Sequence, residues 1–242
     1  MTAAIISAAG SSRRMGGVKK EYRPLGPGAG RDGKPLTVLG GAVSAFTASP
    51  RIGLIVIAVP ADPDTGESAA RKNLPLRFLQ PDASPNIVFV PGGRTRRASV
   101  HRALALLAPY HPDYVVIHDG ARPWLDAPLL ERLLDEVPQR KAVIPILPLI
   151  ETPKEIDEQG LILRHLKRRT IGTAQTPQAF AYPAILYAHE QAAERELRDR
   201  AEYTDDAEVW GEFVGPVSVI PGSPANRKIT FPEDLPGPGD PR

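Results

Sequence analysis

Short apolar runs rich in β-branched residues alternate with amphipathic segments along most of this 242-residue chain. Several runs are apolar throughout, as expected for strands of a parallel sheet with helices on both faces. The predicted strands cover residues 3–8, 54–59, 87–90, 114–118, 142–147 and 217–220. Because such alternation implies right-handed crossovers, we predict an α/β fold: a Rossmann-like, three-layer α/β/α sandwich with a mainly parallel sheet.

Three of the intervening segments carry apolar residues at i, i+3, i+4 and i+7, which is typical of helices that cover a sheet. Their apolar faces are Leu39, Ala42, Val43 and Phe46; Val100, Ala103, Leu104 and Leu107; and Leu130, Leu133, Leu134 and Val137. No internal repeat is found. We therefore expect a single domain over residues 1–235, followed by a flexible tail at residues 236–242.

Two stretches interrupt the alternation. Residues 26–33 are rich in glycine and predict a flexible loop. Residues 150–170 predict a projecting β-ribbon, with a turn at residues 157–160 followed by a very basic run. A ribbon of this kind often serves as a dimer arm, so we place the arm at about residues 149–170.

Composition excludes several classes of protein. With 42% hydrophobic and 24% charged residues, the chain can bury a substantial core, and its formal net charge of +2 gives no support for a general nucleic-acid binder. The absence of cysteine excludes disulfides, a thiolate nucleophile and a Cys-ligated zinc site, and it suits a reducing cytoplasm. The apolar N-terminal run lacks a basic leader and is shorter than the roughly 20 residues that span a bilayer, so no membrane association is expected.

The loop after the first predicted strand is the first candidate site, because ligands of open α/β sheets bind beyond the carboxyl ends of the strands. Its small residues allow close approach to phosphate oxygens, with backbone N–H groups forming an anion nest. Arg14 and Lys20 supply positive charge there. Neither a Walker loop nor Gly-x-Gly-x-x-Gly is present. The alternative is a glycine-containing turn with solvated arginines.

A second candidate site lies at the end of the strand predicted at residues 114–118. Asp119 is well placed there to hold Mg²⁺ through oxygen, and Arg122 to bind a substrate phosphate. The alternative role for Asp119 is to cap the next segment. We expect His118 to be structural, since no partner His or carboxylate lies at metal-ligand spacing.

Motifs over nearly the whole chain resemble those of the 2-C-methyl-D-erythritol 4-phosphate cytidylyltransferases of the non-mevalonate isoprenoid pathway. The family opens with Ala-Ala-Gly-x-x-x-Arg-Met and Lys-x-Tyr, and it carries His-Asp-x-Ala-Arg-Pro in its centre. The matching segments are residues 8–10, 14–15, 20–22, 92–100, 118–123, 152–154, 176–180, 204–207 and 226–235. Their order along the chain makes the resemblance specific, and it implies the family's nucleotidyltransferase fold.

The resemblance implies roles for particular residues. Arg14 and Lys20 would stabilise charge at the α-phosphorus of CTP, and Lys228 would contact phosphate as a third catalytic residue. The cytidine would be held largely through backbone groups. The implied nucleotide-binding residues are Ala8, Ala9, Gly10, Gly93, Arg96, Ser99 and Asp119. Asp119 would also be the ligand of a Mg²⁺ ion bound with CTP.

The acceptor, methylerythritol phosphate, would contact Arg122, Thr152 and Arg168. In this family the last two come from the partner subunit's arm, so the resemblance implies a homodimer with shared active sites. Arg168 is assigned by its spacing of eight residues before Thr176, which leaves Arg169 as an alternative. The acceptor phosphate attacks CTP directly and pyrophosphate leaves, so the chemistry needs alignment and positive charge but no nucleophilic side chain.

The chain also departs from the family pattern. Ser12 stands where a second loop glycine is frequent, and Lys19 where a proline is frequent. Arg94 replaces a frequently acidic residue. Ala225 stands where some members carry an aspartate near the metal, so the sequence identifies no second carboxylate ligand. The loop at residues 26–33 is longer than the family's usual short turn.

Two alternatives to this function remain open. Ile150 and Glu151 depart from the family pattern near the acceptor pocket, so the nearest alternative is a cytidylyltransferase for a pentitol phosphate such as ribitol 5-phosphate. From another class, the chain could be a non-catalytic nucleotide-binding module. Retention of both Arg14 and Lys20 argues against that second alternative.

Overall fold

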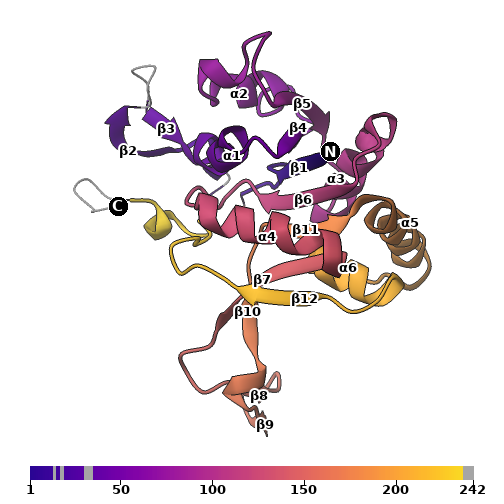
Figure 1. Ribbon diagram of the computed structural model, residues 1–242. Coiled ribbons are helices and arrows are strands. Elements are labelled where there is room, and N and C mark those ends of the chain that lie inside the picture. Colours follow the sequence, from indigo (N-terminus) through magenta and orange to yellow (C-terminus); the bar gives the residue numbers. More distant parts are fainter. Residues whose placement is uncertain (13–14, 17–18, 30–34, 237–242) are drawn as a thin grey trace.

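The computed structural model describes residues 1–12, 15–16, 19–29 and 35–236. Over these residues the chain forms an eight-stranded sheet between two layers of helices (Figure 1). The strand order is β10-β7-β11-β6-β1-β4-β5, with β12 also paired to β7. The strands are β1 (Thr2–Ser7), β4 (Ile52–Val59), β5 (Asn86–Pro91), β6 (Tyr114–Asp119), β7 (Ala142–Pro148), β10 (Gly172–Ala174), β11 (Gln178–Ala181) and β12 (Ser218–Pro221).

The centre of the sheet is parallel: β1 lies between β4 and β6, and β5 extends it beyond β4. The short strands β10 and β11 run antiparallel to their neighbours. All six predicted strands are present, and the predicted mainly parallel α/β/α fold is confirmed. Sequence periodicity missed β10 and β11, because three or four residues with glycine or glutamine carry no apolar run.

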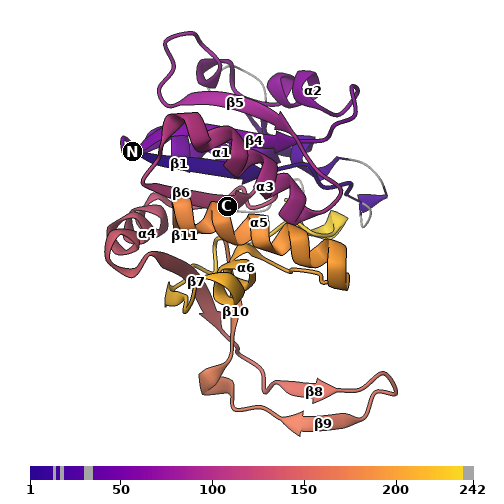
Figure 2. The ribbon, with the colours of Figure 1, turned by 90° about the vertical axis from the view of Figure 1, so that its right-hand side faces the viewer.

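The two faces of β1 enter separate cores because side chains alternate along a strand. Ala4 and Ile6 pack with residues of α1 (Val38–Ala48) and α4 (Ala127–Arg140). Ala3 and Ile5 pack on the opposite face. The helices of that face are α3 (Arg96–Leu107), α5 (Tyr182–Asp199) and α6 (Asp206–Phe213), which lie together in Figure 2. The residues of the three predicted helical faces lie in these two cores, apart from Ala42, which is also fully buried. The helices α5, α6 and the short α2 (Glu67–Lys72) were not predicted.

Side-chain caps define where four of the helices begin. In each case a Thr or Asp oxygen accepts a backbone N–H of the first turn, which satisfies a donor that the helix itself cannot pair. The pairs are Thr37 with Gly40, Thr95 with Ala98, Asp126 with Leu129 and Asp205 with Glu208. Asp126, not Asp119, therefore caps the helix that follows β6.

The glycine-rich stretch differs from its prediction. Its first part belongs to β2 (Pro24–Ala29), which pairs antiparallel with β3 (Pro35–Thr37), so residues 26–29 are strand and not flexible loop. Residues 30–33 lie outside the described residues. Glycine and proline suggested a loop, but a two-stranded edge hairpin tolerates both, because half of its backbone groups need no ladder partner.

The predicted ribbon is present as a hairpin of β8 (Lys154–Ile156) and β9 (Ile162–His165). Gly160 closes the turn with a φ of +82°, a conformation that suits glycine. The hairpin pairs with neither of the other sheets and projects away from the body of the protein (Figures 1 and 2).

Candidate functional site

A cleft of about 680 Å³ opens at the carboxyl ends of the central strands, where the sequence placed the site. Its walls come from the loop after β1, the start of α3, the end of β6 and the segment after β12. The lining residues are Ser7, Ala9, Gly10, Ser11, Ser12, Lys20, Glu21, Gly93, Arg94, Thr95, Arg96, Ser99, Asp119, Ala121, Lys228 and Thr230. Eight predicted site residues from four distant segments thus meet here.

The loop after β1 presents Ala9 and Gly10 to the cleft. Ala8 has a different place: its side chain is fully buried, and its N–H donates to the Ala58 carbonyl over 2.9 Å. Its own carbonyl accepts a hydrogen bond from the Lys19 ammonium. Both backbone groups of Ala8 are therefore used within the protein, and Ala8 anchors the loop.

The opposite wall of the cleft is shaped by the close approach of Gly92 to Ala9 and by the hydrogen bonds of Ser99. A Cβ on Gly92 would lie 2.2 Å from the Ala9 Cβ, so only glycine lets the two loops meet. The Gly93 N–H donates to Ser99 Oγ over 3.0 Å, and Ser99 Oγ donates to the Thr95 carbonyl over 2.9 Å. Gly93 and Ser99 therefore hold each other and give this wall a defined shape.

Two of the predicted catalytic cations are described. Lys20 lines the cleft, and its Nζ donates to the Ile229 carbonyl over 2.8 Å, which joins the first loop to the C-terminal segment. Lys228 lies next to Ile229 in that segment and also faces the cleft. Arg14, the third predicted cation, lies outside the described residues.

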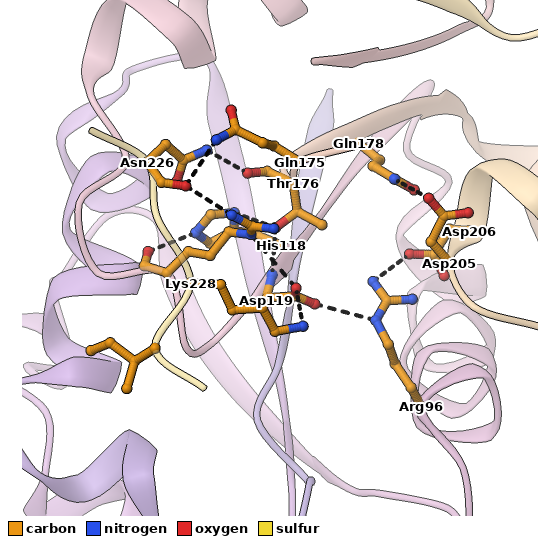
Figure 3. A network of polar contacts seen from close by, with 12 residues as sticks. Arg96, His118, Asp119, Gln175, Thr176, Gln178, Asp205, Asp206, Asn226 and Lys228 are labelled. Atoms are coloured by element: carbon orange, nitrogen blue, oxygen red, sulfur yellow. Dashed lines mark hydrogen bonds and ion pairs between the residues drawn. The ribbon is translucent and has the colours of Figure 1, made fainter. Parts of the chain in front are cut away.

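Asp119 is the electrostatic centre of the site (Figure 3). Its Oδ2 lies 2.8 Å from Lys228 Nζ and 3.7 Å from Arg122 Nε, and its Oδ1 accepts from Arg96 Nε over 3.2 Å. Burial alone would raise the pKa of Asp119, but Lys228, Arg96 and Arg122 outweigh burial and hold that pKa well below its ordinary value. The carboxylate is therefore ionised and fixes the position of three cations.

Arg96 also binds a carboxylate that sequence reasoning did not assign. Its Nη2 donates to Asp206 Oδ2 over 2.7 Å, and Asp206 is fully buried. Burial acts to lower the pKa of Arg96, but Asp206 and Asp119 raise it above its ordinary value. The Thr204–Ala207 motif was recognised in the sequence without a role, and the structure gives it one: Asp206 orients Arg96 from behind (Figure 3).

Side-chain hydrogen bonds join the end of β6 to the loops beside it. Thr176 Oγ1 accepts from the Asp119 N–H over 3.0 Å and lies 3.1 Å from His118 Nδ1. His118 Nε2 lies 3.0 Å from the Arg122 carbonyl. Asn226 Nδ2 donates to the Thr176 carbonyl over 2.7 Å. Burial lowers the pKa of His118 to about 4, so the ring is neutral at pH 7 and has the structural role expected for it.

The predicted acceptor-binding residues do not meet in this chain. Arg122 lies beside the cleft, with its Nη1 donating to the Asn226 carbonyl over 2.8 Å. Thr152 and Arg168 belong to the ribbon, are exposed, and do not line the cleft. Arg168 Nη1 donates to the Ile150 carbonyl over 2.6 Å.

The carboxylates of the cleft fit a Mg²⁺ ion only if a bound substrate supplies further ligands. Among the described residues, no cluster of three or more His, Asp or Glu side chains could hold a metal. Asp119 can supply one oxygen, and Mg²⁺ is commonly held by one or two carboxylates together with substrate phosphates. The residues therefore fit an ion that arrives with a nucleotide.

Over the same described part of the chain, none of the helices combines the length and the hydrophobicity of a transmembrane span.

The fold and the cleft are those of the nucleotidyltransferase-like α/β class: a mainly parallel sheet with a small-residue loop and converging cations at the strand ends. Within that class, the chain belongs to the IspD family, 2-C-methyl-D-erythritol 4-phosphate cytidylyltransferase, whose family model matches residues 2–237.

Relatives support this assignment. The chain is 38% identical over 237 residues to a bifunctional enzyme IspD/IspF of Bradyrhizobium sp. BTAi1, covering 97% of this chain and 54% of that protein. The bifunctional enzyme IspD/IspF of Bartonella henselae is 36% identical over 237 residues, covering 96% and 54%. The chain thus spans about half the length of these curated relatives.

Solved structures show the same fold. The 4-diphosphocytidyl-2C-methyl-D-erythritol synthase of Anaerococcus prevotii superposes with a TM-score of 0.76 at 27% identity, covering 97% of this chain and 94% of that one. The 2-C-methyl-D-erythritol 4-phosphate cytidylyltransferase of Francisella tularensis gives a TM-score of 0.74 at 26% identity, covering 97% and 96%.

Proposed function

We propose that this chain transfers CMP from CTP to 2-C-methyl-D-erythritol 4-phosphate, giving 4-diphosphocytidyl-2-C-methylerythritol and pyrophosphate in non-mevalonate isoprenoid biosynthesis. The observation that carries the proposal is the convergence of Lys20, Lys228 and Asp119 on one cleft beside a loop of small residues. Family membership supplies the identity of the two substrates.

The reaction follows from this arrangement. An oxygen of the acceptor phosphate attacks the α-phosphorus of CTP, forming one P–O bond, while the bond to pyrophosphate breaks. Lys20 and Lys228, with Arg14, supply positive charge where the transition state gains negative charge. Asp119 keeps Lys228 in place. Mg²⁺ bound with the triphosphate and held by Asp119 would neutralise further phosphate charge.

The ribbon supports a homodimer with shared sites. Its large apolar side chains are 52–84% exposed, although an isolated two-stranded hairpin is marginally stable in water. These side chains are Ile150, Ile156, Leu161, Ile162 and Leu163. We propose that the ribbon docks on a second copy and brings Thr152 and Arg168 to the partner's cleft, with Arg169 as the alternative to Arg168. A cytoplasmic location is part of the same proposal.

Pyrophosphate release from CTP and Mg²⁺ tests the function. The assay compares methylerythritol 4-phosphate, ribitol 5-phosphate and no acceptor. We expect release with the first acceptor alone. Release only with ribitol 5-phosphate would keep the chemistry and replace the acceptor. CTP binding without release in any mixture would indicate a non-catalytic nucleotide-binding module instead.

A further inference from the structure

A buried ion pair lies beneath the loop that follows β1 (residues 8–12). Lys19 and Glu21 are 9% and 3% exposed, and Lys19 Nζ lies 2.9 Å from Glu21 Oε2. Burial lowers the pKa of Lys19, and the Glu21 carboxylate acts against that shift. Because the desolvation of two charges offsets much of their attraction, such a pair contributes little to stability by itself. Its position beside the cleft suggests another role.

The Lys19 ammonium binds the loop backbone as well. Nζ donates to the Ala8 carbonyl over 2.5 Å and to the Gly10 carbonyl over 2.7 Å. Together with Glu21, these oxygens match the three N–H donors of an ammonium group. Lys19 thus holds two carbonyls of one short loop at a single point.

This contact fixes the direction of two N–H groups. In a planar trans peptide the C=O and N–H bonds point in opposite directions. The Ala8 carbonyl shares its peptide with the Ala9 N–H, and the Gly10 carbonyl shares its peptide with the Ser11 N–H. With both carbonyls directed at Lys19, both N–H groups point away from it. Ala9 and Ser11 line the cleft, and within the described residues neither N–H has a hydrogen-bond acceptor.

Glu21 connects the same pair to Lys20. The Ser12 hydroxyl lies 3.4 Å from Glu21 Oε2 and accepts a hydrogen bond from the Lys20 N–H over 3.2 Å. Ser12 has a φ of +51°, a left-handed conformation that is unfavourable for a residue other than glycine, and these contacts help to hold it. The backbone of Lys20 is therefore tied to the loop that faces the nucleotide.

We propose that Lys19, paired with Glu21, is a positioning residue that turns the Ala9 and Ser11 N–H groups toward the phosphates of the bound nucleotide. The inference rests on the proposed function for the identity of that ligand, CTP. Lys19 lies behind the loop and is not among the residues that line the cleft, so it acts through the two peptide groups that it holds.

The test compares Glu21→Gln with the double variant Lys19→Met/Glu21→Gln. Both variants lack the Glu21 carboxylate, so neither of them contains a buried carboxylate without its cation. They differ only in the presence of the three N–H donors of Lys19. Titration calorimetry with Mg²⁺ and CTP gives the nucleotide Kd, steady-state assays give the KM values of both substrates, and urea unfolding gives the stability. Arg51→Met, which removes exposed ion pairs with Glu131 and Asp135, is the control for loss of a cation elsewhere.

Relative to Glu21→Gln, the double variant is expected to bind CTP roughly 10- to 100-fold more weakly, the scale of losing one or two hydrogen bonds to a charged group. The KM of the acceptor and the free energy of unfolding should change little. Equal CTP affinity in the two variants, or a loss of affinity that only follows a loss of stability, would overturn the inference. Absence of CTP binding by the unmodified protein would overturn the proposed function, and the inference with it. If the double variant does not fold, Lys19→Met alone is compared with the unmodified protein by the same criteria.

Discussion

Arg96 Nη2 donates to Asp206 Oδ2 over 2.7 Å, which links a cleft-lining guanidinium on α3 to a fully buried carboxylate on α6. The same guanidinium donates from Nε to Asp119 on the other side. Arg96 is thus held between two carboxylates, and its orientation toward the cleft depends on both. Through this contact α6, a short helix whose residues do not line the cleft, is linked directly to a residue that does.

The first prediction concerns Asp206→Asn. The amide removes the negative charge behind Arg96 while Asp119 still pairs with it, so the guanidinium keeps only one of its two charged partners. We expect the KM for CTP to rise about tenfold, the scale of one hydrogen bond to a charged group, with a smaller change in kcat. Steady-state kinetics checks this, and Asp199→Asn, at the exposed end of α5, is the matched control. An unchanged KM for CTP would show that Asp119 alone orients Arg96.

The second prediction concerns Lys20→Ala. Its ammonium reaches the Ile229 carbonyl at the cleft edge, and we propose that it stabilises charge at the α-phosphorus. Removing a donor of this kind typically costs on the order of 10²-fold or more in turnover, with normal folding. Pyrophosphate release measures the loss, and Lys72→Ala on the exposed surface of α2 should behave as the unmodified protein. Near-normal turnover would remove Lys20 from the mechanism.

The third prediction concerns stability in acid. Burial lowers the pKa of His118 from 6.5 to about 4, so between these values the unfolded state binds a proton that the folded state does not. The free energy of unfolding should therefore fall as pH is lowered from about 6.5 to 4, by about 3 kcal/mol from this residue. Urea unfolding at pH 7 and 4.5 measures the fall.

The matched variant for this measurement is His118→Gln, which keeps polar atoms near Thr176 and the Arg122 carbonyl but does not titrate in this range. Its stability should decline less over the same pH interval, so the difference between the two proteins should shrink in acid. Parallel pH profiles would contradict the shifted pKa.

The fourth prediction tests the shared site. Arg168→Ala should mainly raise the KM of the acceptor, and Arg169→Ala should change it little if Arg168 is the contact. Because the proposed dimer pairs one subunit's cleft with the partner's ribbon, mixing Arg168→Ala with Arg14→Ala should restore activity. Each mixed dimer then holds a site with both arginines intact. Failure to complement, with subunit exchange verified by tagged chains, would argue for sites built from a single chain.

Local patterns predicted much of the fold because they act over a few residues. Apolar β-branched runs gave all six predicted strands, and 3.6-residue periodicity gave α1, α3 and α4. The short strands β10 and β11 were missed because their pairing, not their composition, makes them strands. The β2–β3 hairpin was missed for a related reason: its glycines and prolines suggest a loop until the two segments are seen to pair.

In the candidate site, too, some features follow from local sequence and others depend on how the whole chain folds. The sequence by itself determined that a loop of small residues and Asp119 would meet at the carboxyl ends of parallel strands, since strand direction alone brings those ends together. Only the tertiary structure decided the partner of each charge. Asp206 pairs with Arg96, and Lys228 pairs with Asp119, although the two members of each pair lie far apart in the sequence. Lys19 is close to the loop in sequence, but its side chain lies beneath the loop and does not line the cleft. Local propensity carries no information about such contacts, because burial and ion pairing depend on where the whole chain packs.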